Sequence, residues 1–564
     1  MSRIEPHVAI RLKQLFPRIP KQSAGPFFFP GDQLHCADLA WFVSRYPLAM
    51  SEADEAALSG GRLEFEQQQA ELERILLPTY EADRINGIRD DQVLRNYQGQ
   101  AVELTRRRRS LLLGNEGGLG KTYTAGAFLC AESGALPAAV VCDPHMQKQW
   151  MDKLTAFTTL RVHVIKKASP YDLPEADVYV FRVSQIFGWV DIFATGFFKG
   201  VVYDEPQSLR TGTSTSKGGA AKVLSDKALF RLGCTATPVY NYGIEMWNVM
   251  QFIDDCVLGS YEDFSREWVD DAGRIRDPKA LGTYLREQHA ILRRLKSDVG
   301  QELPKVSRII EYVDYDAKTV QSIEELAHRL AIRASTGSFV ERGKAARELD
   351  MMVRQATGVS KAKAVAQFVR LMVEAGEPVL LVGWHRAVYE IWLEELKDIS
   401  PAMYTGSETA AQKEKEKQRF MSGETDVMIM SLRSGAGVDD LQDRCSVVVV
   451  GELDWSPGIH QQIIWRLDRE GQVDPVTAFF LVSEEGSDPP VMDVLGIKAS
   501  EAQHIVDPHV GVQVVADDMS NVQRLVERYL SRGQKKGRAH SDSVRKQTTR
   551  AESVRVDVQE QLFD

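Results

Sequence analysis

Short runs of apolar residues recur along two stretches of the chain, and segments of mixed polarity separate them. In the first stretch the runs are SLLLG (110–114), AAVVCD (138–143), DVYVF (177–181), GVVYDE (200–205) and LFRLG (229–233). In the second they are PVLLVGW (378–384), DVMIMS (426–431), SVVVVG (446–451) and TAFFLV (477–482). Nearly continuous apolar strands that alternate with helices are typical of parallel sheets covered on both faces. The pattern therefore predicts two α/β domains in tandem.

The segment between these stretches, about 254–360, has many charges and the periodicity of surface helices. A clearer helix follows, in which Val365, Val369 and Met372 belong to one apolar stripe and Gly376 is a stop signal. We expect this helix to pack on the second sheet. A last amphipathic stretch at 522–530 precedes a polar, basic tail that is too poor in apolar residues to fold alone.

These patterns divide the chain into six regions. They are an N-terminal accessory region of unassigned fold (1–85), the first α/β domain (86–310), a helical protrusion or linker (311–360), the second α/β domain (361–500), a C-terminal helix region (501–532) and a basic disordered tail (533–564).

Composition narrows the class of protein. The 564 residues carry a net charge of −10, which does not favour a uniformly basic surface but leaves a local one open. No apolar run is long enough to span a bilayer, and the charged N-terminus lacks a signal-peptide core. The six cysteines are scattered without a CxxC pair, so we expect neither a zinc site nor a disulfide framework. A cytoplasmic protein is the expectation.

The candidate chemistry begins at GNEGGLGKT (114–122), which follows a predicted strand and opens a predicted helix. In that setting backbone N–H groups hold phosphates, Lys121 reaches the β- and γ-phosphates, and Thr122 helps to bind Mg²⁺. The usual loop, G-x-x-x-x-G-K-[ST], has its first glycine where this chain has Asn115. A glycine-rich turn without a ligand is the alternative.

A second candidate follows the strand at 200–204. Asp204 and Glu205 come directly after it, where one carboxylate can bind Mg²⁺ and its neighbour can orient the attacking water. Alone, such a pair also fits a solvated turn. Behind a strand, a GKT loop and a helix, it favours ATP hydrolysis.

These motifs resemble those of the Swi/Snf-type ATP-dependent DNA translocases of helicase superfamily two, in their compact annealing-helicase-like branch and of bacterial or phage type. That family begins its loop with D-E-x-G-x-G-K-T, which residues 115–122 match with Asn for Asp. The resemblance continues in order through LRNYQ (94–98), PHMQKQW (144–150), DEPQ (204–207), TATPVYNYGIEMW (235–247), RRLKSDV (293–299), RQATGVSKAKAV (354–365), SLRSGAGVDDLQ (431–442), DWSP (454–457) and QIIWRLDREGQ (462–472).

The resemblance implies two tandem RecA-like parallel-sheet lobes with a helical insertion, and a site for ATP and Mg²⁺. Lys121, Asp204, Glu205, Arg466 and Arg469 would be catalytic, with Thr122 and Asp204 as Mg²⁺ ligands. The nucleotide would also contact Gln98, Gly118, Gly120, Gly437 and Gln462. Gln149, Arg433 and Ser434 are the DNA contacts it suggests.

Arg466 and Arg469 are three residues apart, so we expect them on one helix face. From there they would reach the γ-phosphate as arginine fingers, a device worth roughly 10³–10⁵ in rate in GTPases. The chain departs from the family at Asp439 and Asp440, and at Asp468 and Glu470, which leaves the details of DNA contact open. A degenerate ATPase is the alternative.

The expected function is ATP-dependent translocation on duplex or branched DNA in replication, recombination or repair, at the nucleoid of a bacterial or phage-infected cell. The alternatives are the motor subunit of a restriction or defence system, and a nucleotide-dependent DNA-binding scaffold docked on the sliding clamp. The C-terminal QEQLF resembles the peptide by which bacterial and phage proteins bind the sliding clamp, through Gln559, Leu562 and Phe563. An ordinary tail is the alternative there.

Overall fold

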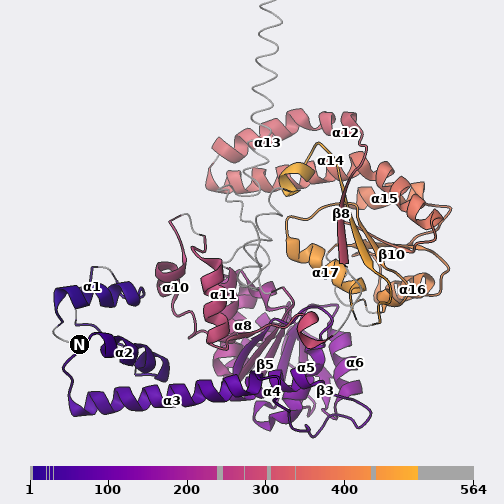
Figure 1. Ribbon diagram of the computed structural model, residues 1–564. Helices are drawn as coiled ribbons and strands as arrows, with labels where there is room; N and C mark the ends of the chain where they lie inside the picture. The colour runs from indigo at the N-terminus through magenta and orange to yellow at the C-terminus, as the bar shows by residue number, and fades with distance from the viewer. Residues whose placement is uncertain are drawn as a thin grey trace, which may run out of the picture. The chain divides into compact units, whose positions relative to one another are not determined.

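The computed structural model describes residues 4–492, except 21, 24–25, 30, 238–244, 272–273, 301–305, 337, 433–437, 439 and 470. The predicted helix region at 501–532 and tail at 533–564 lie outside the described residues. The chain divides into two compact units between residues 303 and 304. Each unit contains one parallel sheet with helices packed on it, which confirms the predicted fold class (Figure 1).

Three helices precede the sheet of the first unit: α1 (Pro6–Leu15), α2 (Gln33–Arg45) and α3 (Glu52–Leu76). Leu12, Phe27 and Phe42 form a small buried cluster of their own. Helix α3 is the long indigo helix of Figure 1, and its last turns bury Leu72 and Ile75 in the core of the first lobe. The N-terminal region is therefore a small helical module joined to that lobe by α3.

The first lobe has a seven-stranded parallel sheet in the order β3-β4-β2-β5-β6-β1-β7. Its strands are β1 (Ser110–Leu113), β2 (Ala138–Cys142), β3 (Val162–Val164), β4 (Val178–Arg182), β5 (Gly200–Asp204), β6 (Phe230–Cys234) and β7 (Ile291–Leu292). Its helices are α4 (Asn96–Arg108), α5 (Lys121–Ala131), α6 (Gln147–Phe157), α7 (Val190–Ala194), α8 (Ser216–Lys227), α9 (Glu245–Ile253), α10 (Tyr261–Trp268) and α11 (Pro278–Glu287). Val201 and Tyr203 enter one apolar cluster while Val202 enters another, because successive side chains of a strand point to opposite faces.

The second lobe has a six-stranded parallel sheet in the order β10-β11-β9-β12-β13-β8. Its strands are β8 (Val306–Tyr312), β9 (Val379–Gly383), β10 (Ala402–Tyr404), β11 (Val427–Ser431), β12 (Val447–Val450) and β13 (Val476–Val482). Its helices are α12 (Ala317–Ser322), α13 (Glu324–Thr336), α14 (Phe339–Glu374), α15 (Arg386–Glu395), α16 (Ala410–Met421) and α17 (Pro457–Leu467). Together the two sheets contain a strand at each of the nine apolar runs.

Helix α14 carries the stripe that the sequence predicts. Val365 and Val369 are fully buried in the apolar cluster of the second lobe, and Gly376 follows with a φ of +87°. No proline interrupts the sequence from 339 to 374, so the helix runs unbroken through the predicted boundary at 360. The predicted helical insertion is therefore continuous with the second lobe.

The division between the lobes also differs from the predicted boundary at 310. Residues 306–312 form β8, which pairs along its whole length with β13. Because those hydrogen bonds belong to the second sheet, residues 306–310 are part of the second lobe.

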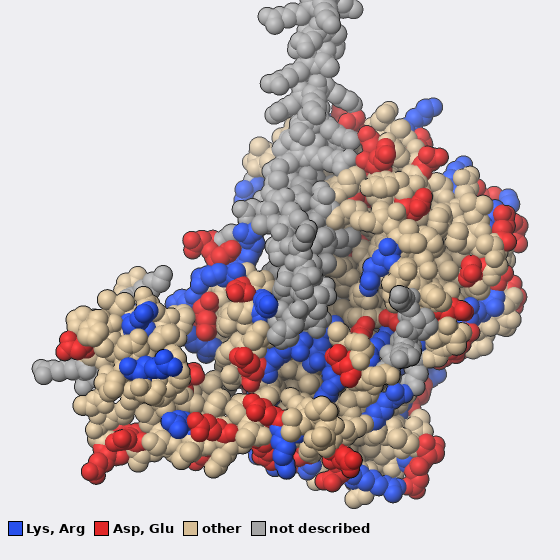
Figure 2. Space-filling model, viewed as in Figure 1, with Lys and Arg blue, Asp and Glu red and all other residues tan. Residues whose placement is uncertain are grey.

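The surface carries charges of both signs. The chain has 79 acidic and 69 basic side chains, and Figure 2 shows them interspersed on the face in view. Within the described ranges, no helix has the length and apolar character needed to cross a membrane.

Candidate active site

Three neighbouring strands of the first sheet bring the predicted ATP motifs together. The phosphate loop follows β1, Asp204 ends β5, and Thr235 follows β6. Their order is β5-β6-β1, with Asp204 opposite Cys234 and Cys234 opposite Leu113. The carboxyl ends of these parallel strands therefore meet at one edge, the usual place for a ligand in an α/β sheet.

The phosphate loop owes its shape to two glycines. Gly118 and Gly120 have φ values of +89° and +69°, a region that L side chains rarely adopt. Gly120 is also the N-cap of α5, and a Cβ there would lie 2.4 Å from Nε2 of Gln98. The first N–H groups of α5 have no acceptors within the helix, so they can bind an anion.

The side chain of Lys121 is hydrogen-bonded to main-chain carbonyl oxygens of the phosphate loop. Its Nζ donates to the carbonyl oxygens of Asn115 at 2.7 Å and Glu116 at 3.2 Å. Burial lowers the pKa of Lys121 to about 8, and the nearby carboxylate of Glu205 opposes this shift. The charge is therefore poorly solvated in this structure, a condition that an incoming phosphate would relieve.

The RRLKSDV segment braces the same loop. Arg293 donates to the carbonyl oxygen of Gly114 at 2.7 Å, and the main-chain N–H of Arg294 donates to Oδ1 of Asn115 at 3.0 Å. The guanidinium of Arg294 reaches on to the carbonyl oxygen of Tyr97 at 3.0 Å. The fully buried Asn115 thus supplies, through Oδ1, the acceptor that holds this segment against the loop. Sequence reasoning identified this segment without finding its role.

Gln98 also contacts the loop. Its Oε1 accepts from the main-chain N–H of Arg95 at 3.0 Å, and its Nε2 donates to the carbonyl oxygen of Leu119 at 3.4 Å. The side chain is 5% exposed. Gln98 therefore joins α4 to the phosphate loop, and its contact with adenine stays a prediction.

The two carboxylates at the end of β5 have different partners. Asp204 Oδ2 accepts from the indole N–H of Trp150 at 2.7 Å. Glu205 Oε2 accepts from Thr235 Oγ1 at 2.6 Å and from Gln207. Burial, reinforced by the neighbouring charge of Glu205, raises the pKa of Asp204 to about 7. Such a carboxyl gains from a nearby cation.

The residues present fit a nucleotide-bound Mg²⁺. Asp204 offers a carboxylate whose charge is poorly solvated, and Thr122 offers a hydroxyl in the first turn of α5. In the described part of the chain, no cluster of three or more His, Cys, Asp or Glu side chains could hold a metal alone. Mg²⁺ usually takes one or two protein ligands with phosphates and water, which matches this set.

Gln149, the predicted DNA contact of the first lobe, lies on α6 and is partly buried. Its neighbour Trp150 contacts Asp204. The DNA-contact role of Gln149 stays a prediction.

In the second lobe, the expectation that Arg466 and Arg469 share one helix face is wrong. Helix α17 ends at Leu467, and Asp468 is its C-cap. The N–H of Arg469 donates to the carbonyl oxygen of Leu467 at 3.1 Å, and Gly471 follows with a φ of +97°. The chain turns after Leu467, so the two arginines belong to different local structures.

Other predicted residues of this lobe can be placed only in part. Gln462 lies on α17 and is partly buried. Arg466 donates to the carbonyl oxygen of Val438 at 3.4 Å, so α17 contacts the SLRSGAGVDDLQ segment. The predictions at Arg433, Ser434, Gly437, Gln559, Leu562 and Phe563 fall outside the described residues.

Helix α14 anchors the DWSP loop. Trp455 donates its indole N–H to Asp350 Oδ1 at 2.8 Å, and Arg354 donates to the carbonyl oxygen of Leu453 at 3.1 Å. The RQATGVSKAKAV and DWSP motifs, about a hundred residues apart in sequence, are therefore one structural unit. This pairing has no signal in the local sequence pattern.

A pocket of about 340 Å³ lies at the carboxyl ends of β9, β10 and β11. Its lining combines hydroxyls, one guanidinium and two aromatic rings: Trp384, Arg386, Tyr389, Thr405, Gly406, Ser407 and Ser431. Hydroxyls and a guanidinium suit phosphate oxygens, so this is a candidate backbone contact for nucleic acid. Sequence reasoning missed it because its residues come from three separate segments.

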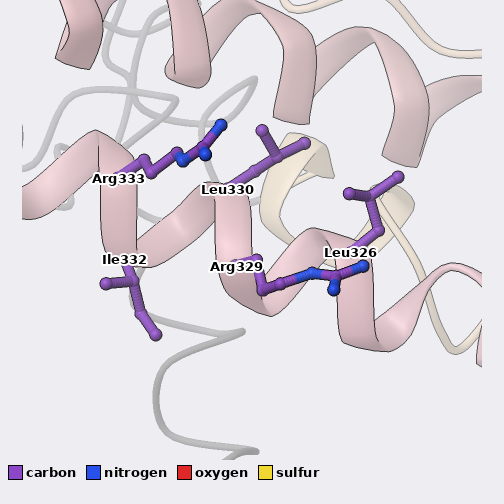
Figure 3. Close-up of a pocket in the computed structure, with 5 residues that line it drawn as sticks. All are labelled: Leu326, Arg329, Leu330, Ile332 and Arg333. Carbon is purple, nitrogen blue, oxygen red and sulfur yellow. The ribbon is translucent and has the colours of Figure 1, made fainter.

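Figure 3 shows a different pocket, of about 420 Å³, along α13. Its lining residues are Leu326, Arg329, Leu330, Ile332 and Arg333. They all belong to one helix of the second unit, α13. None is an acid, base or nucleophile suited to phosphoryl transfer, so we do not place the chemistry there.

Comparisons with known proteins identify the family of the chain. A family model described as the SNF2-related domain matches residues 38–363, which is more than half of the chain. That span contains the phosphate loop, the carboxylate pair and the RRLKSDV brace.

Curated relatives match at low identity. A SWI/SNF-related matrix-associated actin-dependent regulator of chromatin subfamily A-like protein 1 homolog from Caenorhabditis elegans is 24% identical over 399 residues, 67% of this chain and 56% of that protein. An uncharacterized ATP-dependent helicase from Mycoplasma genitalium is 24% identical over 420 residues, 69% of this chain and 40% of that protein. This chain thus spans about half the length of these relatives or less.

Among solved structures, the SWI2/SNF2 ATPase core of Sulfolobus solfataricus in complex with double-stranded DNA is similar, with 19% identity and a TM-score of 0.38. The match covers 76% of this chain and 96% of that one. On the strength of the family model and the motifs it spans, this chain belongs to the SNF2-related domain family.

Proposed function

We propose that this chain hydrolyses ATP and uses the energy to move along DNA. The observation that carries the proposal is the meeting of Lys121, Asp204 and Glu205 at the carboxyl edge of one sheet. The Mycoplasma relative, an ATP-dependent helicase by name, supports the same class of activity.

In this proposal each residue has a chemical task. Lys121 and the first N–H groups of α5 bind the β- and γ-phosphates. Asp204 and Thr122 hold Mg²⁺, which supplies a Lewis acid for the phosphate oxygens. Glu205, fixed by Thr235, orients the attacking water.

The second lobe completes the chemistry in this proposal. Arg466 and Arg469 stabilise the charge that develops on the transferred phosphoryl group. Gly437 and Gln462 contribute further nucleotide contacts. These roles rest on the family motifs.

The DNA contacts proposed here are electrostatic. Arg386, Ser407 and Ser431 line the pocket at the end of the second sheet and would hold backbone phosphates, whereas the Thr405 hydroxyl donates to Glu408. Such contacts ignore base sequence, so duplex or branched DNA of any sequence is the proposed substrate. Gln149, Arg433 and Ser434 are further proposed contacts.

We also propose a biological setting for this activity. We place the chain in the replication, recombination or repair machinery of a bacterial or phage-infected cell, with Gln559, Leu562 and Phe563 as a sliding-clamp peptide. A restriction or defence motor is the second candidate, and a nucleotide-dependent scaffold the third.

The test is ATP hydrolysis by the purified chain, alone and with single-stranded, duplex or forked DNA, or RNA. We expect strong stimulation by duplex or forked DNA that is lost in Lys121→Ala. Lys199→Ala is the matched control, because this exposed lysine precedes β5 at the opposite edge of the sheet and should leave the rate unchanged. A wild-type chain that hydrolyses no ATP with any nucleic acid would contradict the motor and favour the scaffold.

A further inference from the structure

Trp150 makes a contact with the catalytic carboxylates that the motif comparison does not assign. It lies on α6, is 1% exposed, and donates its indole N–H to Asp204 Oδ2 at 2.7 Å. Its ring packs in the apolar cluster that also contains Val140 and Val202. Both the packing of the ring and the hydrogen bond from its N–H therefore fix the position of this side chain.

An indole N–H is well suited to hold a metal-binding carboxylate. It is a donor only, and it is neutral, so it fixes an oxygen without adding a charge that competes with a cation. Asp204 Oδ1 receives no hydrogen bond from the described residues. One oxygen of Asp204 is thus tied to α6 while the other stays open to a ligand.

We propose that Trp150 is a positioning residue that fixes the carboxylate of Asp204 for the Mg²⁺ of the bound nucleotide. The proposal rests on the ATPase function proposed above. It assigns to the PHMQKQW segment a task at the metal, in addition to the DNA contact expected of it.

The proposal differs from a purely structural role in one measurable way. A tryptophan that only fills the core would affect folding stability and leave metal affinity alone. A positioning residue would weaken the contribution of Mg²⁺ to nucleotide binding, because second-sphere hydrogen bonds orient metal ligands.

The experiment compares Trp150→Phe with Trp189→Phe in the full chain. Phenylalanine keeps most of the buried ring and removes the N–H. Trp189 is the matched control, since it is fully buried in the same lobe and donates its N–H to a carbonyl oxygen, that of Lys167, at 3.1 Å. For each protein we would measure ADP affinity with Mg²⁺ and with EDTA, the Mg²⁺ concentration for half-maximal ATP hydrolysis, and the thermal midpoint.

We expect Trp150→Phe to raise the half-activating Mg²⁺ concentration by about tenfold, the size expected for one lost hydrogen bond to a charged group. The gain in ADP affinity on adding Mg²⁺ should shrink by a similar factor, with affinity in EDTA unchanged. Trp189→Phe should lower only the thermal midpoint. Equal Mg²⁺ responses in Trp150→Phe and wild type would overturn the proposal.

A second variant and a wild-type control distinguish failure of this inference from misfolding and from failure of the proposed ATPase function. If Trp150→Phe does not fold, benzothienylalanine at position 150 replaces the N–H by sulfur at nearly constant shape, and the same Mg²⁺ shift is expected. If the wild-type chain hydrolyses no ATP at any Mg²⁺ concentration, the proposed ATPase function fails and this inference fails with it. A wild type that responds to Mg²⁺ beside a variant that responds equally refutes only the role of Trp150.

Discussion

At Gly120 the main chain has a left-handed conformation that disfavours any side chain. The φ is +69°, and an added Cβ would displace the amide of Gln98, which donates to the carbonyl oxygen of Leu119 in the loop. We expect Gly120→Ala to weaken nucleotide binding by about tenfold or more, because the strained backbone and the displaced Gln98 alter the loop that would bind phosphate. Titration with a fluorescent ADP analogue, alongside thermal unfolding, measures both effects.

Gly196 supplies a control with the same backbone geometry. Its φ is also +69°, but nothing lies within 4 Å of an added Cβ. Gly196→Ala should lose roughly 1–2 kcal/mol of stability from the left-handed backbone alone, with nucleotide affinity unchanged. Equal nucleotide affinities in the two variants would show that the contact between position 120 and Gln98 does not affect nucleotide binding.

Single residues also show what the sequence could and could not predict. Lys121, Asp204 and Glu205 follow their strands directly, so local order was enough to bring them to one sheet edge. Trp150 and Arg293 reach the site from α6 and from the segment beside β7. Their contacts depend on which strands become neighbours, and no local pattern contains that information.

Helix α17 presents a buried histidine whose protonation the fold opposes. His460 is 4% exposed, and its Nε2 accepts from the main-chain N–H of Asp454 at 3.0 Å. Burial lowers the pKa of His460 to about 4, although the charge of Asp454 opposes this. The folded state therefore keeps this imidazole neutral where the unfolded chain, with a pKa of about 6.5, would bind a proton.

The sign of the pH dependence follows from this depressed pKa. Between pH 6.5 and 4 the unfolded state binds more protons, so stability is greatest above pH 6.5 and falls as the pH falls. The loss attributable to His460 is on the order of 3 kcal/mol by pH 4. Thermal midpoints of wild type and His460→Gln measured from pH 7.5 to 4.5 should converge toward the acid end. Parallel pH curves would contradict the assignment.

The sequence predicts the interior strands of both sheets but not their edge strands. All nine predicted strands are interior, while β3, β7, β8 and β10 occupy the four sheet edges and were not predicted. Interior strands are buried on both faces and read as continuous apolar runs. Edge strands lack that constraint: β7 has two residues, and β8 is exposed along most of its length. A continuous apolar run therefore predicts the interior strands and misses the edge strands, which are less buried.

For the whole molecule, the net charge of −10 means that the proposed binding to DNA would depend on local groups rather than on overall attraction. We expect duplex affinity to fall steeply with salt, and Arg386→Ala to reduce the log–log salt slope by about 1. Lys397→Ala is the control, since Lys397 is also well exposed to solvent but lies beyond the far end of α15. Identical slopes for Arg386→Ala and wild type would remove the pocket beside β10 from the DNA path.

Because the chain divides into two units, we expect nucleotide binding and the rate of ATP hydrolysis to depend on different residues. Most of the groups that would bind ADP and Mg²⁺, including Lys121 and Asp204, belong to the first unit, whereas Arg466 and Arg469 belong to the second. Binding and hydrolysis should therefore separate in mutants. Arg466→Ala and Arg469→Ala are each expected to keep Mg-ADP affinity within about twofold, because the ground-state contacts remain, and to lower kcat by about 10³, as loss of an arginine finger does.

Because Arg466 is helical and Arg469 lies in the following turn, the two substitutions need not have equal effects. Arg466→Lys and Arg469→Lys distinguish charge from geometry, because a lysine keeps the charge and loses the planar fork. Complete loss of activity would indicate a bidentate contact at the substituted position, and partial activity would indicate that charge alone contributes there. Single-turnover hydrolysis at saturating DNA measures the chemical step directly. A variant that loses Mg-ADP affinity and keeps its rate would reverse the assignment and make that arginine a ground-state ligand.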